Sequence, residues 1–244
     1  MRILILVLVL AGRVHAEPLK ISDRHAQPPV ADGDLTDWAG AKFQTIICGR
    51  AQAAEVALAH DATNLYLAYR ITHSSPLHNR GQDAQHHFKE GAAVDLMLGP
   101  ACEKPTTPQT GDLRLLLVPT QPKPVAMLYR QVWPEALPED RVEFRSPVRT
   151  VTFDSVREMP EVTVVFHKTP TGYVCEARVP YRALGITPRA GQTMRGDLGI
   201  LLANDGGLLT SQRCNLFNQL ATTVSDIPTE AELTPAGWGE FVWD

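Results

Sequence analysis

Hydrophobic and polar residues alternate with a period of two along much of the chain. Every second residue in the segment 65–71 is apolar, and the segment 173–179 repeats this alternation. A β-strand that buries one face needs this pattern. The segment 162–168 precedes 173–179 across a turn sequence at 169–172, so the two segments predict a β-hairpin.

Turn sequences rich in Asp, Asn, Gly and Pro separate the other strand candidates. These candidates cover 42–48, 54–59, 92–98, 113–118, 125–132, 148–156, 194–204 and 240–243. The alanine-rich segment 51–59 has helical propensity, but a turn and a clear strand follow it at hairpin distance, which favours a strand over its second half. Helix is predicted only as one short turn over 180–185, which starts with proline and ends with glycine.

These elements predict an all-β fold, because about ten strands have no helices to cover a parallel sheet. We expect an antiparallel, jelly-roll-like β-sandwich of two packed sheets. The proline-rich segments 105–110, 119–124 and 134–138 would form loops at its ends. No internal repeat or Gly/Ser-rich linker divides the chain, so residues 17–244 are expected to form a single domain.

The first sixteen residues predict a secretory signal peptide. Arg2 is followed by an apolar run from Ile3 to Ala11 and then by Gly12-Arg13-Val14-His15-Ala16, which ends in a small residue. The apolar run is much shorter than the ~20 residues of a transmembrane helix. We therefore expect removal of residues 1–16, export to the periplasm or the medium, and no membrane span after processing.

Charge argues against a nucleic-acid partner. Residues 1–16 contain Arg2 and Arg13 and no acid, so their removal lowers the number of basic residues from 23 to 21 against 27 acidic residues. Nucleic-acid binding needs a cationic surface, which this balance does not favour.

The chain contains four cysteines, at Cys48, Cys102, Cys175 and Cys214. An even number in an exported chain is typical of one or two disulfides, and the sequence leaves all three pairings open. Their separations match no zinc, redox or haem motif, so bridged or buried structural cysteines are predicted.

The motifs of common catalytic sites are absent from the sequence. It contains no G-x-S-x-G, H-E-x-x-H, phosphate loop or G-x-G-x-x-G. His73, His78, His86 and His87 lie close together, but their spacing matches no metal motif, which favours surface histidines over zinc or copper ligands. We therefore predict a binding protein and not an enzyme, with no cofactor.

Asp32, Asp34 and Asp37 place three carboxylates in a short turn sequence before Trp38. Carboxylates and backbone carbonyls are the ligands that calcium prefers, so a structural calcium ion is one interpretation. Asp also builds tight turns without a metal, so an Asx-type turn that positions Trp38 is the other.

A sugar site would use an exposed aromatic side chain, because the apolar faces of pyranose rings stack on indole rings. Trp38, Trp238 and Trp243 lie beside strand sequences and are predicted to be core residues. Trp133 lies at the start of a loop and is the candidate for an exposed stacking residue.

A series of short motifs covers nearly all of residues 17–244 in one order. It opens with Asp-Gly-Asp-Leu-Thr-Asp-Trp at 32–38 and continues through 61–71, 88–96, 172–180, 183–185 and 235–239. In these motifs the chain resembles the family 9 carbohydrate-binding modules and the family-9-like sandwich proteins of bacteria. The resemblance implies a jelly-roll-like sandwich that binds glycans, with calcium in some members.

The resemblance also implies ligand contacts at Arg70, Asp95, Arg213 and Asn218. Such modules usually accompany glycoside hydrolases, and this chain carries no catalytic domain. It also differs around 213–218, where relatives tend to place a Tyr-Trp pair after the arginine.

Three hypotheses follow. The first is an exported glycan-binding protein that acts by aromatic stacking and polar contacts, alongside glycoside hydrolases in carbohydrate catabolism. The second is an interaction or structural protein of the cell envelope that keeps the sandwich without a sugar site. The third, least favoured, is a glycan-acting hydrolase or a metal- or haem-carrying sandwich.

Overall fold

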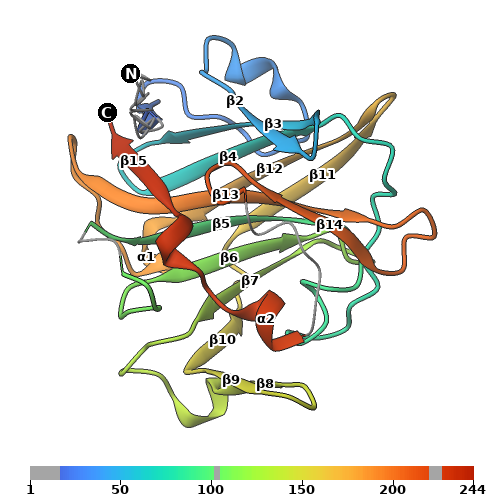
Figure 1. Ribbon diagram of the computed structural model, residues 1–244. Coiled ribbons are helices and arrows are strands. Elements are labelled where there is room, and N and C mark those ends of the chain that lie inside the picture. The colour runs from blue at the N-terminus through green and yellow to red at the C-terminus, as the bar shows by residue number, and fades with distance from the viewer. Residues whose placement is uncertain (1–16, 102–104, 220–226) are drawn as a thin grey trace, which may run out of the picture.

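Two β-sheets pack face to face in the computed structural model, which describes residues 17–101, 105–219 and 227–244. The first sheet contains β10 (Ser155–Glu158), β7 (Val125–Arg130), β6 (Leu113–Val118), β5 (Ala93–Pro100), β13 (Thr193–Ala203) and β15 (Gly239–Trp243), with β14 (Thr210–Asn215) also paired to β13. The second contains β3 (Ala51–His60), β4 (Asn64–Ile71), β12 (Gly172–Pro180) and β11 (Thr163–Thr169), with β2 (Gln44–Cys48) paired to β3. In Figure 1 the second sheet lies above the first. The predicted all-β, jelly-roll-like sandwich is confirmed.

One strand, β1 (Leu19–Asp23), belongs to both sheets. Its first three residues pair in parallel with β15, and its last two pair in parallel with the end of β3. The expectation of two antiparallel sheets did not include this link, which joins the sheets into one curled, mixed sheet. The other pairings between the described strands are antiparallel, as expected for short hairpin connections.

The facing sides of the two sheets form the largest hydrophobic core. In β4 the alternate residues Leu65, Leu67, Tyr69 and Ile71 all point into this core and are fully buried. Full burial of such a side chain stabilises the fold by about 1.5–3 kcal/mol. The period of two therefore predicted the core face of this strand correctly.

The outer faces of both sheets are covered as well. Against the first sheet pack the hairpin of β8 (Val142–Arg145) and β9 (Thr150–Phe153) and the short helix α2 (Ile227–Ala231). Phe144 and Phe153, from this hairpin, meet edge to face at 5.2 Å between ring centroids. A smaller cluster around Trp38 covers alanines of the second sheet. Strands buried on both faces are apolar at most positions, as in β5 and β6, where Asp95 and Arg114 are the charged exceptions.

Several boundaries differ from the predicted ones. The expected strand 148–156 is interrupted at Asp154, which accepts a hydrogen bond from the backbone N–H of Trp133, and its two halves, β9 and β10, pair with different strands. Strand β3 begins at Ala51, because its alanine-rich first half pairs with β2. The sequence analysis did not predict β1, β8, β14 or α2.

The remaining short elements connect the strands. The predicted helical turn is α1 (Tyr181–Leu184), which ends at Gly185 in the left-handed conformation, with φ of 64°. Three 3-10 turns cover Leu35–Trp38, Pro138–Asp140 and Pro235–Gly237. Within the described residues no helix is long and apolar enough to cross a membrane.

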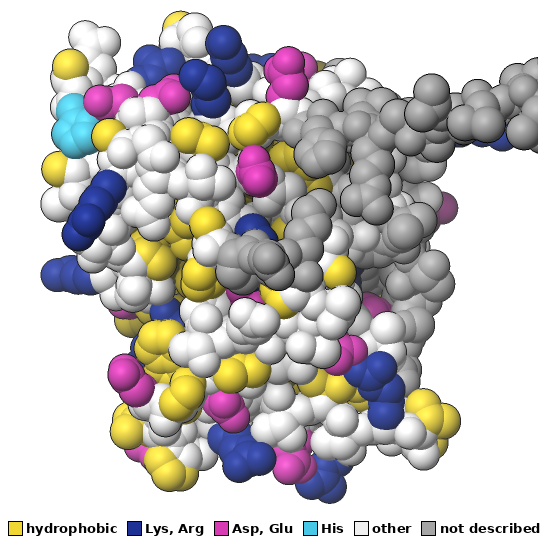
Figure 2. All heavy atoms as spheres, turned by 60° about the vertical axis from the view of Figure 1, so that its left-hand side comes forward, with side chains coloured by type: hydrophobic (Ala, Val, Ile, Leu, Met, Phe, Trp, Pro, Cys, Tyr) yellow, Lys and Arg dark blue, Asp and Glu magenta, His cyan; other side chains and the backbone are white. Residues whose placement is uncertain are grey.

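Exposed apolar side chains are few relative to the buried ones. Val30, Leu137 and Val148 are examples, and they come from different loops. On the face shown in Figure 2, hydrophobic, basic and acidic side chains are interspersed.

A disulfide between Cys48 on β2 and Cys214 on β14 joins the two sheets across a sequence separation of 166 residues. Cys175 is a buried free thiol in the core. Cys102 lies outside the described residues, as does the predicted signal peptide, 1–16. Of the three pairings that the sequence left open, the structure contains the Cys48–Cys214 bond.

Reduction of this disulfide should lower the free energy of unfolding by about 2–4 kcal/mol, because the bond removes conformational entropy from the unfolded chain. Urea unfolding of the oxidised and reduced protein measures the difference. The double variant Cys48→Ser/Cys214→Ser is the control and should not respond to reductant. Equal stability of the oxidised and reduced wild-type protein would contradict the prediction.

Candidate binding site

All five predicted ligand residues have partners within the chain. Arg70 lies on the outer face of the second sheet, where its Nη1 is 2.6 Å from Glu55 Oε2 and its guanidinium lies 4.9 Å from the centroid of the Phe43 ring. Trp133 follows β7 and is half-buried, with the Arg130 guanidinium 4.4 Å from the centre of its ring. Arg70 and Trp133 therefore lie in different parts of the molecule.

Asp95 and Arg213 lie together on the outer face of the first sheet. Asp95 Oδ2 accepts a hydrogen bond from Arg114 Nε at 2.8 Å, and Arg114 Nη2 is 2.6 Å away. Arg114 and Arg213 both donate from Nη1 to the backbone carbonyl of Glu230 in α2, at 3.2 and 2.7 Å. The Glu230 side chain forms ion pairs with Lys89 and Arg213. We call these five residues the buried charge cluster.

The buried charge cluster is shielded from water except at Lys89, whose side chain is 25% exposed. The Asp95 and Arg114 side chains are 0% and 3% exposed, and that of Glu230 is 1% exposed. Burial, together with the nearby charge of Arg114, lowers the pKa of Arg213 to about 10. In this structure α2 therefore closes the cluster to a ligand. The charges pair with one another, while Asp95 Oδ1 and Arg213 Nε are buried and have no hydrogen-bond partner among the described residues.

Asn218, the fifth predicted residue, lies beside a second buried acid. Asp197 on β13 accepts hydrogen bonds from the backbone N–H groups of Leu198, Phe217 and Asn218, at 2.8, 3.0 and 2.9 Å. The Asn218 amide donates to Thr234 Oγ1 at 3.1 Å. Burial raises the pKa of Asp197 to about 6, although these hydrogen bonds oppose the shift. Asp197 thus fixes the loop that follows β14.

The carboxylates proposed for calcium take part in a series of turns. Asp34 accepts a hydrogen bond from the backbone N–H of Thr36 at 3.0 Å, and Asp32 accepts one from that of Asp34 at 2.9 Å. Asp37 accepts one from that of Val30 at 2.7 Å. The Asx-type turn is confirmed. Calcium at Asp32, Asp34 and Asp37 stays a prediction.

This turn places Trp38 against the second sheet. The indole Nε1 of Trp38 donates to Glu176 Oε1 at 2.7 Å, and the backbone N–H of Gly33 donates to Glu176 Oε2 at 2.7 Å. Burial raises the pKa of Glu176, and these two hydrogen bonds oppose the shift. One buried carboxylate therefore fastens both ends of the turn.

Across the described part of the chain, no group of three or more His, Cys, Asp or Glu side chains is placed to hold a metal ion. His86 Nδ1 is 2.7 Å from Asp83 Oδ1. His73 Nδ1 accepts a hydrogen bond from the backbone N–H of Ser75 at 3.0 Å. His87 is buried, so the expectation of a surface histidine is wrong at this position, and burial lowers its pKa.

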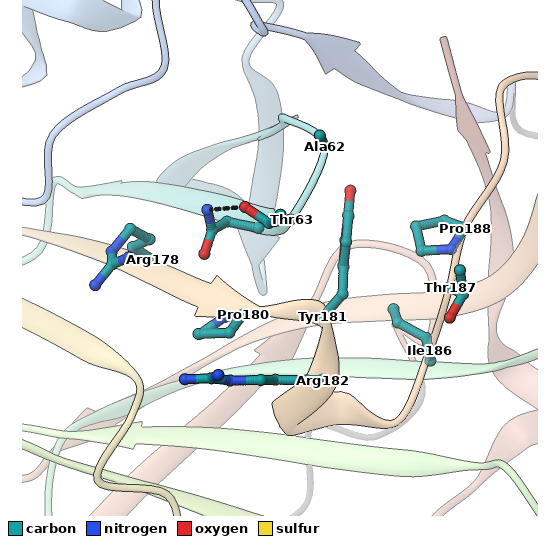
Figure 3. Close-up of a pocket in the computed structure, with 10 residues that line it drawn as sticks. Ala62, Thr63, Arg178, Pro180, Tyr181, Arg182, Ile186, Thr187 and Pro188 are labelled. Atoms are coloured by element: carbon teal, nitrogen blue, oxygen red, sulfur yellow. Dashed lines mark hydrogen bonds between the residues drawn. The ribbon is translucent and has the colours of Figure 1, made fainter.

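An open pocket of about 490 Å³ lies where β4 begins and β12 ends, beside α1 (Figure 3). Tyr181 stands in its middle. Arg178, Pro180 and Arg182 lie on one side of the Tyr181 ring, and Ile186, Thr187 and Pro188 lie on the other. The pocket thus combines apolar surface with hydroxyl and guanidinium donors, and its volume falls within the range of small-ligand sites.

The residues beside the pocket are firmly held. Asp61 accepts hydrogen bonds from the backbone N–H groups of Thr63 and Asn64, at 2.6 and 2.7 Å, and from the Tyr66 hydroxyl at 2.6 Å. Burial opposes ionisation, but these hydrogen bonds hold the pKa of the Asp61 carboxyl well below its usual range. The backbone N–H of Tyr181 donates to the Thr63 carbonyl at 2.8 Å, which joins α1 to this turn.

The sequence analysis did not predict Arg114 and Glu230, which pair with Asp95 and Arg213, and it did not predict the pocket beside α1. Arg114 carried a signal, because a single charge inside the apolar segment 113–118 predicts a buried partner on a neighbouring strand. Glu230 gave no such signal, since the pattern predicted no element there. The alternation in 173–179 puts Arg178 on the outward face of its strand, but no local pattern connects it with Arg182.

Comparisons with known proteins find similarity at the level of the fold. No protein-family model and no curated protein sequence match the chain. A family 9 carbohydrate-binding module from Caldicellulosiruptor kristjanssonii, solved in complex with cellotriose, is 16% identical with a TM-score of 0.59, over 93% of this chain and 94% of that one. A structure of a family 9 module from the same organism in complex with glucose is 14% identical with a TM-score of 0.57, over 93% and 96%. The resemblance seen in the sequence motifs is thus confirmed for the fold.

Replacing Glu176 should destabilise the protein through Trp38. Glu176→Ala leaves the Trp38 and Gly33 donors without their acceptor, which should lower the free energy of unfolding by about 2–3 kcal/mol. Urea unfolding followed by tryptophan fluorescence measures the change. Glu55→Ala is the matched control, because it breaks a partly exposed ion pair and should cost less than about 1 kcal/mol. Equal losses in the two variants would contradict the assignment.

Asp197→Asn should change how stability depends on pH. Because burial raises the pKa of Asp197 from 3.8 to about 6, the folded state keeps a proton that the unfolded state has already lost in this range. The stability that Asp197 contributes therefore falls as pH rises from about 4 to about 6, by at most about 3 kcal/mol.

Unfolding of both proteins across this pH range measures the effect. The stability of the wild type relative to Asp197→Asn should fall as the pH rises. A pH-independent difference would contradict the raised pKa.

Proposed function

We propose that this protein is a non-catalytic glycan-binding protein. The observation that supports this proposal is the fold, which matches family 9 modules solved with cellotriose and with glucose over 93% of the chain. A sandwich of this kind has its inner faces filled by the core, so recognition falls to outer surfaces and loops. The pocket beside α1 is an outer surface with the mixed apolar and polar lining that sugars require.

The buried charge cluster is proposed as a support of the outer face and not as the sugar contact. Its charges pair with one another beneath α2, and a ligand would have to displace the Glu230 carbonyl to reach Arg213. Arg70 and Asn218 likewise have partners within the chain. Trp133 is only half-buried, so the Trp133→Ala variant tests whether its ring stacks on a sugar.

Export to the periplasm or the medium is part of the proposal. The segment 1–16 has the composition of a signal peptide, and the Cys48–Cys214 disulfide supports an oxidising compartment, where such bonds persist. Glycan binding in that compartment fits a role beside secreted glycoside hydrolases in carbohydrate catabolism.

The second candidate is an interaction or structural protein of the cell envelope. The observation that favours it is the burial of Asp95 and Arg213, two residues that the family resemblance assigned to the ligand. A stoichiometric complex with an envelope protein that sugars do not displace, together with no glycan binding, would select this candidate.

Titration calorimetry against a panel of soluble oligosaccharides tests the proposed function. We expect saturable binding of at least one glycan, with a dissociation constant of about 1 mM or tighter, and no change in the glycan after prolonged incubation. Trp133→Ala examines the stacking residue in the same titration, with the exposed Arg50→Ala as control. Absence of binding to every glycan would overturn the proposed function, and cleavage of the glycan would overturn its non-catalytic part.

A further inference from the structure

The pocket beside α1 carries two arginines without acidic partners. The Arg178 guanidinium makes one contact, 3.4 Å from Nη2 to Thr163 Oγ1, which is at the limit of a hydrogen bond. Among the ion pairs of the described residues neither Arg178 nor Arg182 takes part, and both side chains are exposed. This contrasts with Arg114 and Arg213, whose charges are neutralised within the fold.

The two guanidinium groups extend to the same side of the pocket in Figure 3, next to Pro180. The lining contains no Asp or Glu. The nearby carboxylate of Asp61 is occupied by the donors of its own turn, including the Tyr66 hydroxyl. A negative group of a ligand would therefore meet two available cations and no competing acid from the lining.

The rest of the lining suits a sugar ring. Pro180 and Tyr181 line the pocket but are buried, so the half-buried Ile186 and Pro188 offer most of the apolar surface. The exposed Thr63 and Thr187 bring hydroxyl groups. The backbone N–H of Tyr181 is bonded to the Thr63 carbonyl, and its hydroxyl accepts a hydrogen bond from Trp243 Nε1 at 3.2 Å, so the Tyr181 ring is held in place. A preformed site loses less entropy when it binds its ligand.

Resting on the proposed function, we infer that this pocket binds a carboxylated sugar, a hexuronate residue of an acidic glycan. The carboxylate is held by Arg178 and Arg182, which match its planar shape through paired N–H donors. The ring lies over the exposed edge of Tyr181, between the arginines and the half-buried Ile186 and Pro188, and its hydroxyls meet Thr63 and Thr187. Binding should weaken as salt is added, because both arginines are exposed to solvent.

Matched ligands test this inference on the full-length processed protein. Galacturonic acid, its methyl ester and galactose differ at the C6 substituent, so they separate the charge from the sugar ring. By NMR titration we expect galacturonic acid to bind at least about tenfold more tightly than the other two. Arg178→Ala and Arg182→Ala should each reduce its affinity by about tenfold, while Arg50→Ala, an exposed arginine in another turn, should leave it unchanged.

The outcomes separate this inference from the function on which it rests. Equal affinity for galactose and galacturonic acid, or loss of affinity no greater in the two pocket variants than in Arg50→Ala, would overturn the inference and leave glycan binding intact. Acetate binding as tightly as galacturonic acid would overturn the recognition of a sugar ring. Failure of acidic and neutral glycans alike to bind the wild type would overturn both proposals. Unchanged melting temperatures of the variants confirm that they fold.

Discussion

The outer face of the first sheet is covered by the β8–β9 hairpin and α2, so the charged side chains beneath them have lost their contact with water. A buried charge is tolerated only when it is paired and hydrogen-bonded. Asp95 pairs with Arg114, and Arg213 pairs with Glu230, which commits these side chains to the fold. The requirement is met only in part, because Asp95 Oδ1 and Arg213 Nε have no hydrogen-bond partner among the described residues. The same constraint leaves recognition to charges that were never covered, and Arg178 and Arg182 are two of these.

This division explains why two similar arginines on neighbouring sheets have different roles. Arg213 lies under α2, where its Nη1 is bonded to the Glu230 carbonyl and its charge is screened by acids. Arg178 projects from the outer face of the second sheet, where the turn that carries Trp38 covers other positions and leaves the end of β12 open. Position relative to the covering elements, and not residue type, decides which arginine is available to a ligand.

The sequence was informative where one local pattern controls the structure. Alternation in 65–71 and 173–179 located the inner faces of β4 and β12, and Asp32 to Asp37 predicted the turn that carries Trp38. It failed where a partner distant in the chain decides the outcome. Thr210–Asn215 has a mostly polar pattern and becomes a strand because β13 supplies its pairing. The burial of Arg213 was not predicted for the same reason, because nothing in its local sequence indicates that Glu230 covers it.

The pairing of β1 with β15 also constrains the order in which the two sheets fold and join. These strands stand at opposite ends of the described chain, yet Leu19 lies beside Phe241, and β1 then continues to β3. The seam between the two sheets therefore forms only after β15, Gly239–Trp243, has been synthesised. Until then β1 and β13 lack their pairing with β15 and keep open edges, which are hazards for association with other chains. Such distant contacts are slow to form, so closure of the seam is expected among the latest events of folding.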